Sequence, residues 1–212
     1  MQKTIKNLIA AYLGEAQARQ RYTFYASAAK KEGYEQIAEI MTTTAEQEKK
    51  HGKTFYEFLV KLNKQSDGLP RSTAGEMSEG QRSSPPTKIE LPMDLEIEVV
   101  LGTTADNLKS SIALENDEFA NLYPKFADEA QAEGFPEIAA KFRAIAHAEQ
   151  HHKMNFEKLL VLVESGTYFK DRGVQVRVCR ECGYMVVGDT APTICPSCDH
   201  PQAYFERLQN DY

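Results

Sequence analysis

The sequence has no apolar run long enough to cross a membrane. Its longest uninterrupted run, at 8–13, is six residues, whereas a membrane-spanning helix needs about 20. The first residues also contain no signal-type apolar block followed by a cleavage site. We therefore expect a protein that is not exported, that has no membrane partner and that works in the cytoplasm.

Tryptophan is absent, and positive charge is scarce relative to negative charge. The 212 residues include 25 Lys and Arg against 31 Asp and Glu, a formal net charge of −6. Nucleic acids and anionic membranes repel an acidic protein, so neither is expected as a main partner. The remaining composition, with 42% hydrophobic and 26% charged residues, is typical of one or two globular domains.

Cysteines are few and confined to one segment. Two Cys-x-x-Cys pairs separated by twelve residues contain all of them, at Cys179, Cys182, Cys195 and Cys198. They cannot cross-link the 178 residues before them, so in a chain with no export signal they indicate a metal site. Four thiolates form a tetrahedral site that binds either iron or zinc.

The segment around these cysteines is too short to fold on apolar burial alone. Val174, Val176 and Val178 alternate with polar residues, which is typical of a strand. Roughly 40 residues cannot form an independent hydrophobic core, so a bound metal must supply the missing stability. We predict a small β-rich metal domain at 167–212.

Residues 1–166 have the spacing of a helical bundle. Residues 3–62 contain two helices divided by Gly33, with apolar positions recurring every three or four residues. A polar stretch at about 63–100 interrupts this pattern, and two further helices follow, divided by Gly134. Two helical hairpins joined by a long crossover predict an all-α four-helix bundle of the ferritin-like kind.

An internal repeat supports this arrangement. Glu-Gly-Tyr-Glu-Gln-Ile-Ala at 32–38 matches Glu-Gly-Phe-Pro-Glu-Ile-Ala at 133–139, an offset of 101 residues. The third helix also contains Pro124, which is expected to bend it because proline frees the carbonyl group of the residue four positions earlier.

The same offset relates two Glu-x-x-His motifs on the inward faces of the second and fourth helices. Residues i and i+3 project from one face of a helix, so each motif can bind metal. With a carboxylate from each of the other two helices, this is the pattern of a di-iron or di-manganese site. Five carboxylates with two imidazoles could not all ionise without cations, so without metal some of them must take up protons, and the pKa values of those carboxylates rise. The candidate catalytic and metal-binding residues are Glu15, Glu48, His51, Glu115, Glu118, Glu149 and His152.

Two tyrosines near this pattern leave two interpretations open. Tyr22 and Tyr123 are also related by the offset of 101 and lie about two turns beyond the carboxylates of their helices. They either donate hydrogen bonds to the metal ligands or are ordinary core residues. His147 and His151 lie on a neighbouring face and are expected to be exposed.

Together these motifs resemble those of the rubrerythrin family over essentially the whole chain. The matching segments are Glu-Ala-Gln-Ala-Arg from Glu15, Glu48-x-x-His51, Glu115-x-x-Glu118, Glu149-x-x-His152 and the cysteine pairs with Gly183-Tyr184. The resemblance implies that Glu15 and Glu115 are terminal iron ligands. It also implies that Glu48 and Glu149 bridge the two irons.

The resemblance further implies that His152 binds one iron, while His51 and Glu118 alternate on the other as the redox state changes. The C-terminal segment would be a rubredoxin-like domain whose iron is bound by Cys179, Cys182, Cys195 and Cys198, giving three iron ions per chain. Asp199 departs from the pattern, because rubredoxins prefer glycine after the last cysteine.

The activity that the resemblance implies is reduction of hydrogen peroxide to water in protection against oxidative stress. A homodimer is expected, with electrons from a rubredoxin or an NAD(P)H-dependent reductase passing through the four-cysteine iron. Two alternatives stay open at this point: ferritin-like iron oxidation and storage, and a non-enzymatic module with a structural zinc ribbon. The adjacent dinuclear redox site favours iron over zinc at the cysteines.

Overall fold

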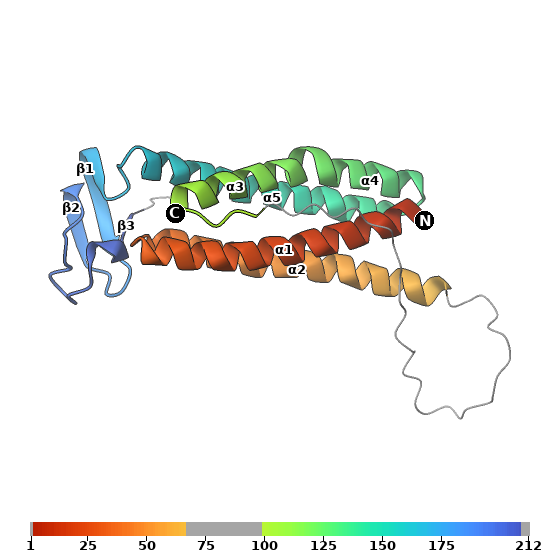
Figure 1. The fold of residues 1–212 in the computed structure, drawn as a ribbon, viewed down its shortest axis with the longest axis horizontal. Coiled ribbons are helices and arrows are strands. Elements are labelled where there is room, and N and C mark those ends of the chain that lie inside the picture. The colour runs from red at the N-terminus through yellow and green to blue at the C-terminus, as the bar shows by residue number, and fades with distance from the viewer. Residues whose placement is uncertain (1, 67–98, 209–212) are drawn as a thin grey trace, which may run out of the picture.

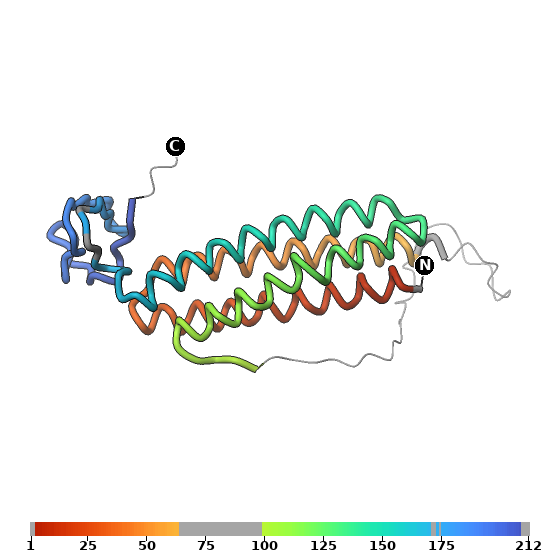
Figure 2. The backbone as a smooth tube through the Cα atoms, turned by 90° about the horizontal axis from the view of Figure 1, so that it is seen from above, coloured from red at the N-terminus to blue at the C-terminus, as the bar shows by residue number. Residues whose placement is uncertain are grey.

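The computed structural model describes residues 2–66 and 99–208, and it contains a helical bundle with a small sheet at one end (Figure 1). The bundle consists of α1 (Gln2–Lys31), α2 (Glu35–Ser66), α3 (Thr104–Asp117), the π-helix η1 (Glu118–Leu122), α4 (Tyr123–Ala132) and α5 (Pro136–Glu164). The segment α3–η1–α4 is continuous, so four helical rods lie side by side (Figure 2). The predicted four-helix bundle is confirmed. Within the described residues, no helix is long and apolar enough to cross a membrane.

The repeat is visible in the way the two hairpins cap each other. Gly33 and Gly134 both have φ 84°, a left-handed conformation that glycine adopts without steric cost and that ends each first helix. The Glu32 carboxylate accepts a hydrogen bond from the Thr104 amide at 3.0 Å. Glu133 accepts one from the Thr4 amide, also at 3.0 Å. Each turn therefore caps the first helix of the other hairpin.

Two apolar clusters fill the bundle on either side of its middle. One includes Leu8, Phe55 and Phe142, and the other includes Ile37 and Met41, all of them 0% exposed. These residues belong to the helices whose apolar positions recur every three or four residues, so that spacing predicted the core correctly. The predicted metal ligands occupy the layer between the two clusters.

The third rod is irregular close to Pro124, where a bend was expected. The irregularity begins earlier, at η1, where the Tyr123 amide donates to the carbonyl group of Glu118 in an i→i+5 bond. A π-turn accommodates one extra residue. The internal repeat contains this extra residue, because Glu15 and Glu115 are offset by 100, whereas Tyr22 and Tyr123 are offset by 101. The third rod therefore contains one more residue than α1 between the two aligned pairs.

The C-terminal part is a three-stranded antiparallel sheet of order β2-β1-β3. Its strands are β1 (Lys170–Cys179), β2 (Met185–Thr190) and β3 (Phe205–Arg207), with the 3₁₀-helix η2 (Gln202–Tyr204) before the last. The predicted β-rich character is confirmed. The expected crossover at 63–100 lies mostly outside the described residues, and α2 continues four residues past the predicted helix end at 62.

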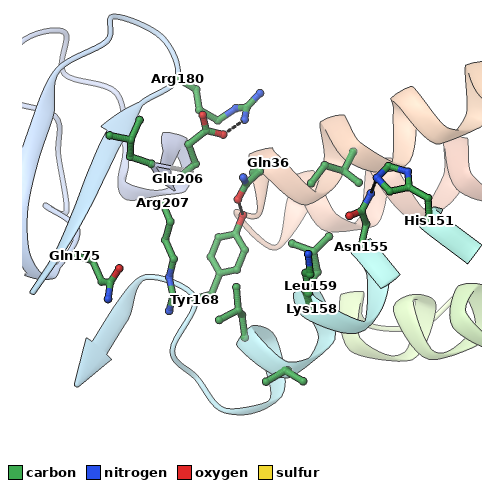
Figure 3. A pocket seen from close by; sticks show the side chains of 14 residues that line it. Gln36, His151, Asn155, Lys158, Leu159, Tyr168, Gln175, Arg180, Glu206 and Arg207 are labelled. Atoms are coloured by element: carbon green, nitrogen blue, oxygen red, sulfur yellow. Dashed lines mark hydrogen bonds and ion pairs between the residues drawn. The ribbon is translucent and has the colours of Figure 1, made fainter. Parts of the chain in front are cut away.

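A groove of about 920 Å³ separates the sheet from the bundle, and contacts along it hold the two parts together (Figure 3). The Tyr168 hydroxyl donates to the side-chain oxygen of Gln36 in α2 at 3.1 Å. Arg180, which lies between two of the cysteines, pairs with Glu206 and with Glu39 of α2. The sheet is therefore held against the bundle by side chains as well as by the chain connection.

Candidate metal centres

The seven residues of the predicted dinuclear site converge in the middle of the bundle. They come from all four rods, and six of them are at most 4% exposed: Glu15, Glu48, Glu115, Glu118, Glu149 and His152. His51 is the exception, with 15% of its side chain exposed. This burial needs compensation, because several carboxylates share one small volume.

The ligand atoms form two overlapping groups of four. One group is Glu15, Glu48, His51 and Glu149, and the other is Glu48, Glu115, Glu149 and His152. In each group, one atom from every residue lies within 4.8 Å of the others. Glu48 and Glu149 belong to both groups. Two adjacent metal positions that share two carboxylates fit this arrangement.

The unpaired atoms in this layer test whether metal ions fit it. Six buried atoms of this layer have no aligned hydrogen-bond partner among the described residues: Glu15 Oε2, Glu48 Oε1, Glu115 Oε2, both carboxylate oxygens of Glu149, and His152 Nδ1. Buried polar atoms are rarely left without partners. Carboxylate oxygens and imidazole nitrogens are ligands that iron accepts, so the donor set fits a pair of iron ions.

Burial dominates the electrostatics of the outer carboxylates. Burial, followed by repulsion from Glu118, raises the pKa of Glu15 well above its ordinary value. Burial and the neighbouring Glu115 raise the pKa of Glu118 in the same way, and burial raises the pKa of Glu115 to about 8. These shifts match the expected behaviour of carboxylates crowded together without cations.

Glu48 behaves differently from the outer carboxylates, because two imidazoles face it. Burial opposes its ionisation, but hydrogen bonds from His152 and His51 hold the pKa of Glu48 below its usual value. Burial likewise opposes protonation of the imidazoles, yet hydrogen bonds to Glu149 and Glu48 raise the pKa of His51 to about 9. Hydrogen bonds to Glu115 and the other carboxylates raise the pKa of His152 to about 12.

Glu118 lies beside the two groups without belonging to either. Its side chain comes from η1, and one of its oxygens lies 3.5 Å from the Tyr123 hydroxyl. A side chain at residue 14 would contact that carboxylate, since a Cβ built on Gly14 lies 3.7 Å from Glu118 Oε1. The matching position in the first half, at an offset of 100, is the buried Ala18. Six of the seven candidate ligands therefore have a counterpart in the other half of the repeat, and Glu118 does not.

The two tyrosines donate hydrogen bonds across the bundle. The Tyr22 hydroxyl donates to Glu115, and the Tyr123 hydroxyl donates to Glu15. Both rings are fully buried, and burial raises both tyrosine pKa values well above the ordinary one. Of the two interpretations left open by the sequence, hydrogen bonding to the carboxylate layer is the one observed.

Gln47 also reaches this layer, and the sequence analysis did not identify it. Its side-chain oxygen lies 3.0 Å from Nε2 of His152. An exposed glutamine next to Glu48 has no distinctive pattern, so only the three-dimensional arrangement reveals the contact. His147 and His151 are exposed, as expected.

The four cysteines form a second compact site within the sheet domain. One sulfur from each lies within 4.8 Å of the others. The Cys179–Cys198 and Cys182–Cys195 sulfur pairs are each 3.7 Å apart. A tetrahedron with metal–sulfur bonds of about 2.3 Å has edges of about 3.8 Å. The spacing therefore fits one tetrahedral metal ion.

The two cysteine turns have the same backbone geometry. The Gly183 amide donates to the Cys179 carbonyl group at 2.9 Å, and the Asp199 amide donates to that of Cys195 at 3.0 Å. Gly183 has φ 76° and Asp199 has φ 60°. Asp199 thus adopts the left-handed conformation in the very position where glycine was expected.

Comparison with protein-family models accounts for both parts of the chain. The Rubrerythrin model matches residues 6–160 and 106–175, and the model of the rubrerythrin rubredoxin-like domain matches 178–206. The chain belongs to the rubrerythrin family. A rubrerythrin of Porphyromonas gingivalis is 45% identical over 210 residues, which cover 99% of this chain and 92% of that protein.

Solved structures agree with this assignment. A structure of nigerythrin in a mixed-valence state is 25% identical, with a TM-score of 0.56, and the match covers 97% of this chain and 86% of that one. The bacterioferritin BfrA of Mycobacterium tuberculosis, at 17% identity, matches 76% of this chain and 86% of its own with a TM-score of 0.54. The latter likeness concerns the ferritin-like fold alone.

Membership of the rubrerythrin family defines the metal content and the general role. The chain binds a di-iron centre and a rubredoxin-like iron, three iron ions in all. It is an oxidoreductase with a role in oxidative stress.

Proposed function

We propose that this rubrerythrin reduces hydrogen peroxide to water with electrons delivered through its rubredoxin-like iron. The reduction consumes two electrons and two protons per peroxide and yields two water molecules. Two adjacent ferrous ions supply both electrons at one place. The observation that supports this function is the pair of ligand groups sharing Glu48 and Glu149, attached to a four-cysteine domain.

We propose the following roles for the bundle residues. Glu15 and Glu115 would each hold one iron, and Glu48 and Glu149 would hold both, which the membership of Glu48 and Glu149 in both groups supports. His152 binds the iron on the Glu115 side. His51 and Glu118 would be the alternative ligands of the other iron in its two redox states, and the position of Glu118 just outside the site supports this role.

The surrounding residues orient these ligands and exclude water. The hydroxyl hydrogen atoms of Tyr22 and Tyr123 hold carboxylate oxygens of Glu115 and Glu15, so the carboxylates cannot rotate freely. The apolar clusters above and below the layer limit access of water. The exposed edge of His51 is the part of the site nearest to solvent among the described ligands.

The iron of the rubredoxin-like domain is proposed to be bound by Cys179, Cys182, Cys195 and Cys198, whose 3.7 Å sulfur spacing supports the assignment. Cys182 is exposed, which suits electron transfer from a partner. That partner is a rubredoxin or an NAD(P)H-dependent reductase. The family resemblance supports a homodimer that acts in the cytoplasm.

Stopped-flow mixing of the anaerobically reduced protein with each oxidant tests the proposed activity. We expect hydrogen peroxide to reoxidise the iron faster than oxygen does. We also expect that no ferric mineral accumulates in the protein. A His152→Ala variant with its four-cysteine iron intact is the control, and its reaction with peroxide should be slow. Faster reaction of the wild-type protein with oxygen would instead favour ferritin-like iron oxidation.

A further inference from the structure

The hydrogen bond between Gln47 and His152 selects one tautomer of the imidazole. The Gln47 side-chain oxygen can only accept, so the proton lies on His152 Nε2, 3.0 Å away. When a metal ion displaces a proton from the ring, the proton that leaves is therefore the one on the other nitrogen, Nδ1. This nitrogen lies 2.9 Å from a Glu149 oxygen and 3.1 Å from a Glu48 oxygen, inside the carboxylate layer. Gln47 therefore holds the ring in the form that binds metal.

His51 faces the same layer without a comparable partner. Its Nδ1 lies 2.8 Å from Glu48 and 3.0 Å from Glu149. Its Nε2 accepts or donates no hydrogen bond within the part of the chain that the structure describes. This ring is also the more exposed of the two, at 15% against 4%. Thus Nε2 of His152 is hydrogen-bonded to a side chain, and Nε2 of His51 is not, among the residues that the structure describes.

The internal repeat explains the difference. His51 and His152 are related by the offset of 101, and the same offset relates Gln47 to Ala148. If the two halves were equivalent, residue 148 of α5 would hold His51 as Gln47 of α2 holds His152. A methyl group cannot accept a hydrogen bond. The chain thus has the anchoring side chain in one half and lacks it in the other.

Such an outer contact changes the strength of a metal ligand. A hydrogen bond to the distal nitrogen fixes the ring orientation and increases its basicity, and its loss typically weakens metal binding by about 10–100-fold. We propose that Gln47 is a positioning residue that makes the His152 side the tighter of the two metal positions, and that Ala148 leaves His51 free to detach. This inference rests on the ligand roles proposed above.

Metal titration of the full-length protein tests the inference without relying on turnover. Co²⁺ is added to metal-free protein, and calorimetry resolves the binding steps. Binding to the cysteines is followed separately through its thiolate-to-cobalt absorption. Gln47→Ala should weaken one bundle step about 10–100-fold and leave the cysteine step unchanged. Gln47→Glu keeps a hydrogen-bond acceptor, so it should bind metal at that bundle step with the wild-type affinity. Gln20→Ala, an exposed glutamine change on α1, is the matched control.

The converse variant tests the asymmetry. Ala148→Gln should strengthen the weaker bundle step about 10-fold. In ¹⁵N spectra of the zinc-loaded protein, the Nε2–H proton of His152 should exchange slowly with solvent in the wild type and rapidly in Gln47→Ala. In Ala148→Gln the Nε2–H proton of His51 should become slow to exchange. These spectra report on the ring itself, which a purely structural role of Gln47 would not alter.

The outcomes separate failure of this inference from failure of the ligand assignment. If Gln47→Ala leaves both bundle affinities and the exchange of His152 unchanged, Gln47 has no positioning role. If Ala148→Gln has no effect on either measurement, the asymmetry has another origin. His152→Ala should abolish one bundle step, and a variant that retains both steps would overturn the ligand assignment itself.

Discussion

At the scale of single residues, Asp199 shows what a departure from a family pattern costs. Its φ of 60° lies in the left-handed region, which costs a residue with a Cβ roughly 1–2 kcal/mol, less for aspartate. Its amide also donates to the Cys195 carbonyl group, so the conformation cannot relax without breaking the turn. The position needs this backbone shape whatever side chain occupies it.

We therefore expect Asp199→Gly to stabilise the metal-loaded protein by roughly 0.5–1 kcal/mol. Relief of the left-handed conformation outweighs the extra chain entropy of glycine in the unfolded state. Chemical denaturation of the sheet domain measures the effect. Asp189→Gly, in β2 where φ is negative, is the control and should destabilise; equal effects of the two changes would contradict the explanation.

The hydrogen bond from Tyr123 to Glu15 leads to a second prediction at the scale of single residues. The Tyr123 hydroxyl donates to Glu15 and lowers the pKa of that carboxyl relative to burial alone. Tyr123→Phe removes the donor, so metal binding at the bundle should weaken about 10-fold. Tyr25→Phe is matched, since the Tyr25 hydroxyl contacts Ser110 outside the site. Cobalt titration of both variants compares them, and equal affinities would show that the Tyr123 hydroxyl does not orient Glu15.

The sequence identified six of the seven proposed ligands because they repeat, and Glu118 because it follows Glu115 by one turn, but it missed Gln47. Glu48 and Glu149 were found through their shared offset. Gln47 has no counterpart, and its contact with His152 crosses from α2 to α5, so spacing along one helix could not reveal it. The lowered pKa of Glu48 depends on the two imidazoles that converge on it, which is a property of the packed site.

At the scale of elements, the extra residue in η1 is the clearest difference between the two halves. The sequence contains it as a change of offset from 100 to 101, and the irregularity expected from Pro124 falls in the same place, since the carbonyl group four residues before this proline is that of Ala120 in η1. The inserted residue places Glu118 where the other half has Ala18. The helix boundaries themselves were well predicted, because Thr103 caps α3 and glycine ends each first helix.

A deletion tests this interpretation of η1. In a Glu118→Ala background, deletion of Asn121 combined with Pro124→Thr should give the third rod the uninterrupted spacing of α1. We expect a melting temperature within about 5 °C of the background, since 1 kcal/mol corresponds to roughly 2–4 °C at this size. Deleting Gln20 from α1 is the control and should lower stability far more. Equal damage from both deletions would mean that η1 is not an insertion.

At the scale of the whole molecule, the metal-free protein should lose stability as the pH rises. Burial raises the folded-state pKa of Glu115 to about 8 and also raises those of Glu15 and Glu118. A carboxyl whose pKa is raised on folding favours the fold below its unfolded pKa, and this contribution is lost as the pH rises through the folded value. Glu48, with a lowered pKa, acts in the opposite sense below its usual pKa.

Calorimetry of metal-free and iron-loaded protein between pH 5 and 8 measures this dependence. The raised pKa values of His51 and His152, about 9 and 12, add to this trend above the ordinary imidazole pKa, because the unfolded chain loses those protons before the folded protein does. The metal-free protein should therefore melt at progressively lower temperatures towards pH 8, while bound iron removes most of the trend. Coincident curves for the two forms at every pH would contradict the convergence of these glutamates.

The reciprocal caps give the bundle the symmetry of a dimer made from one chain. Glu32 meets Thr104 and Glu133 meets Thr4, so the contact made by the first half on the second is returned by the second on the first. This is the rule of an isologous interface. The amides of Thr4 and Thr104 need only a glutamate at a helix-ending turn as acceptor, and that turn can come from either chain. A hairpin from another copy of the chain would satisfy the same caps, so exchange of halves between two molecules preserves these contacts.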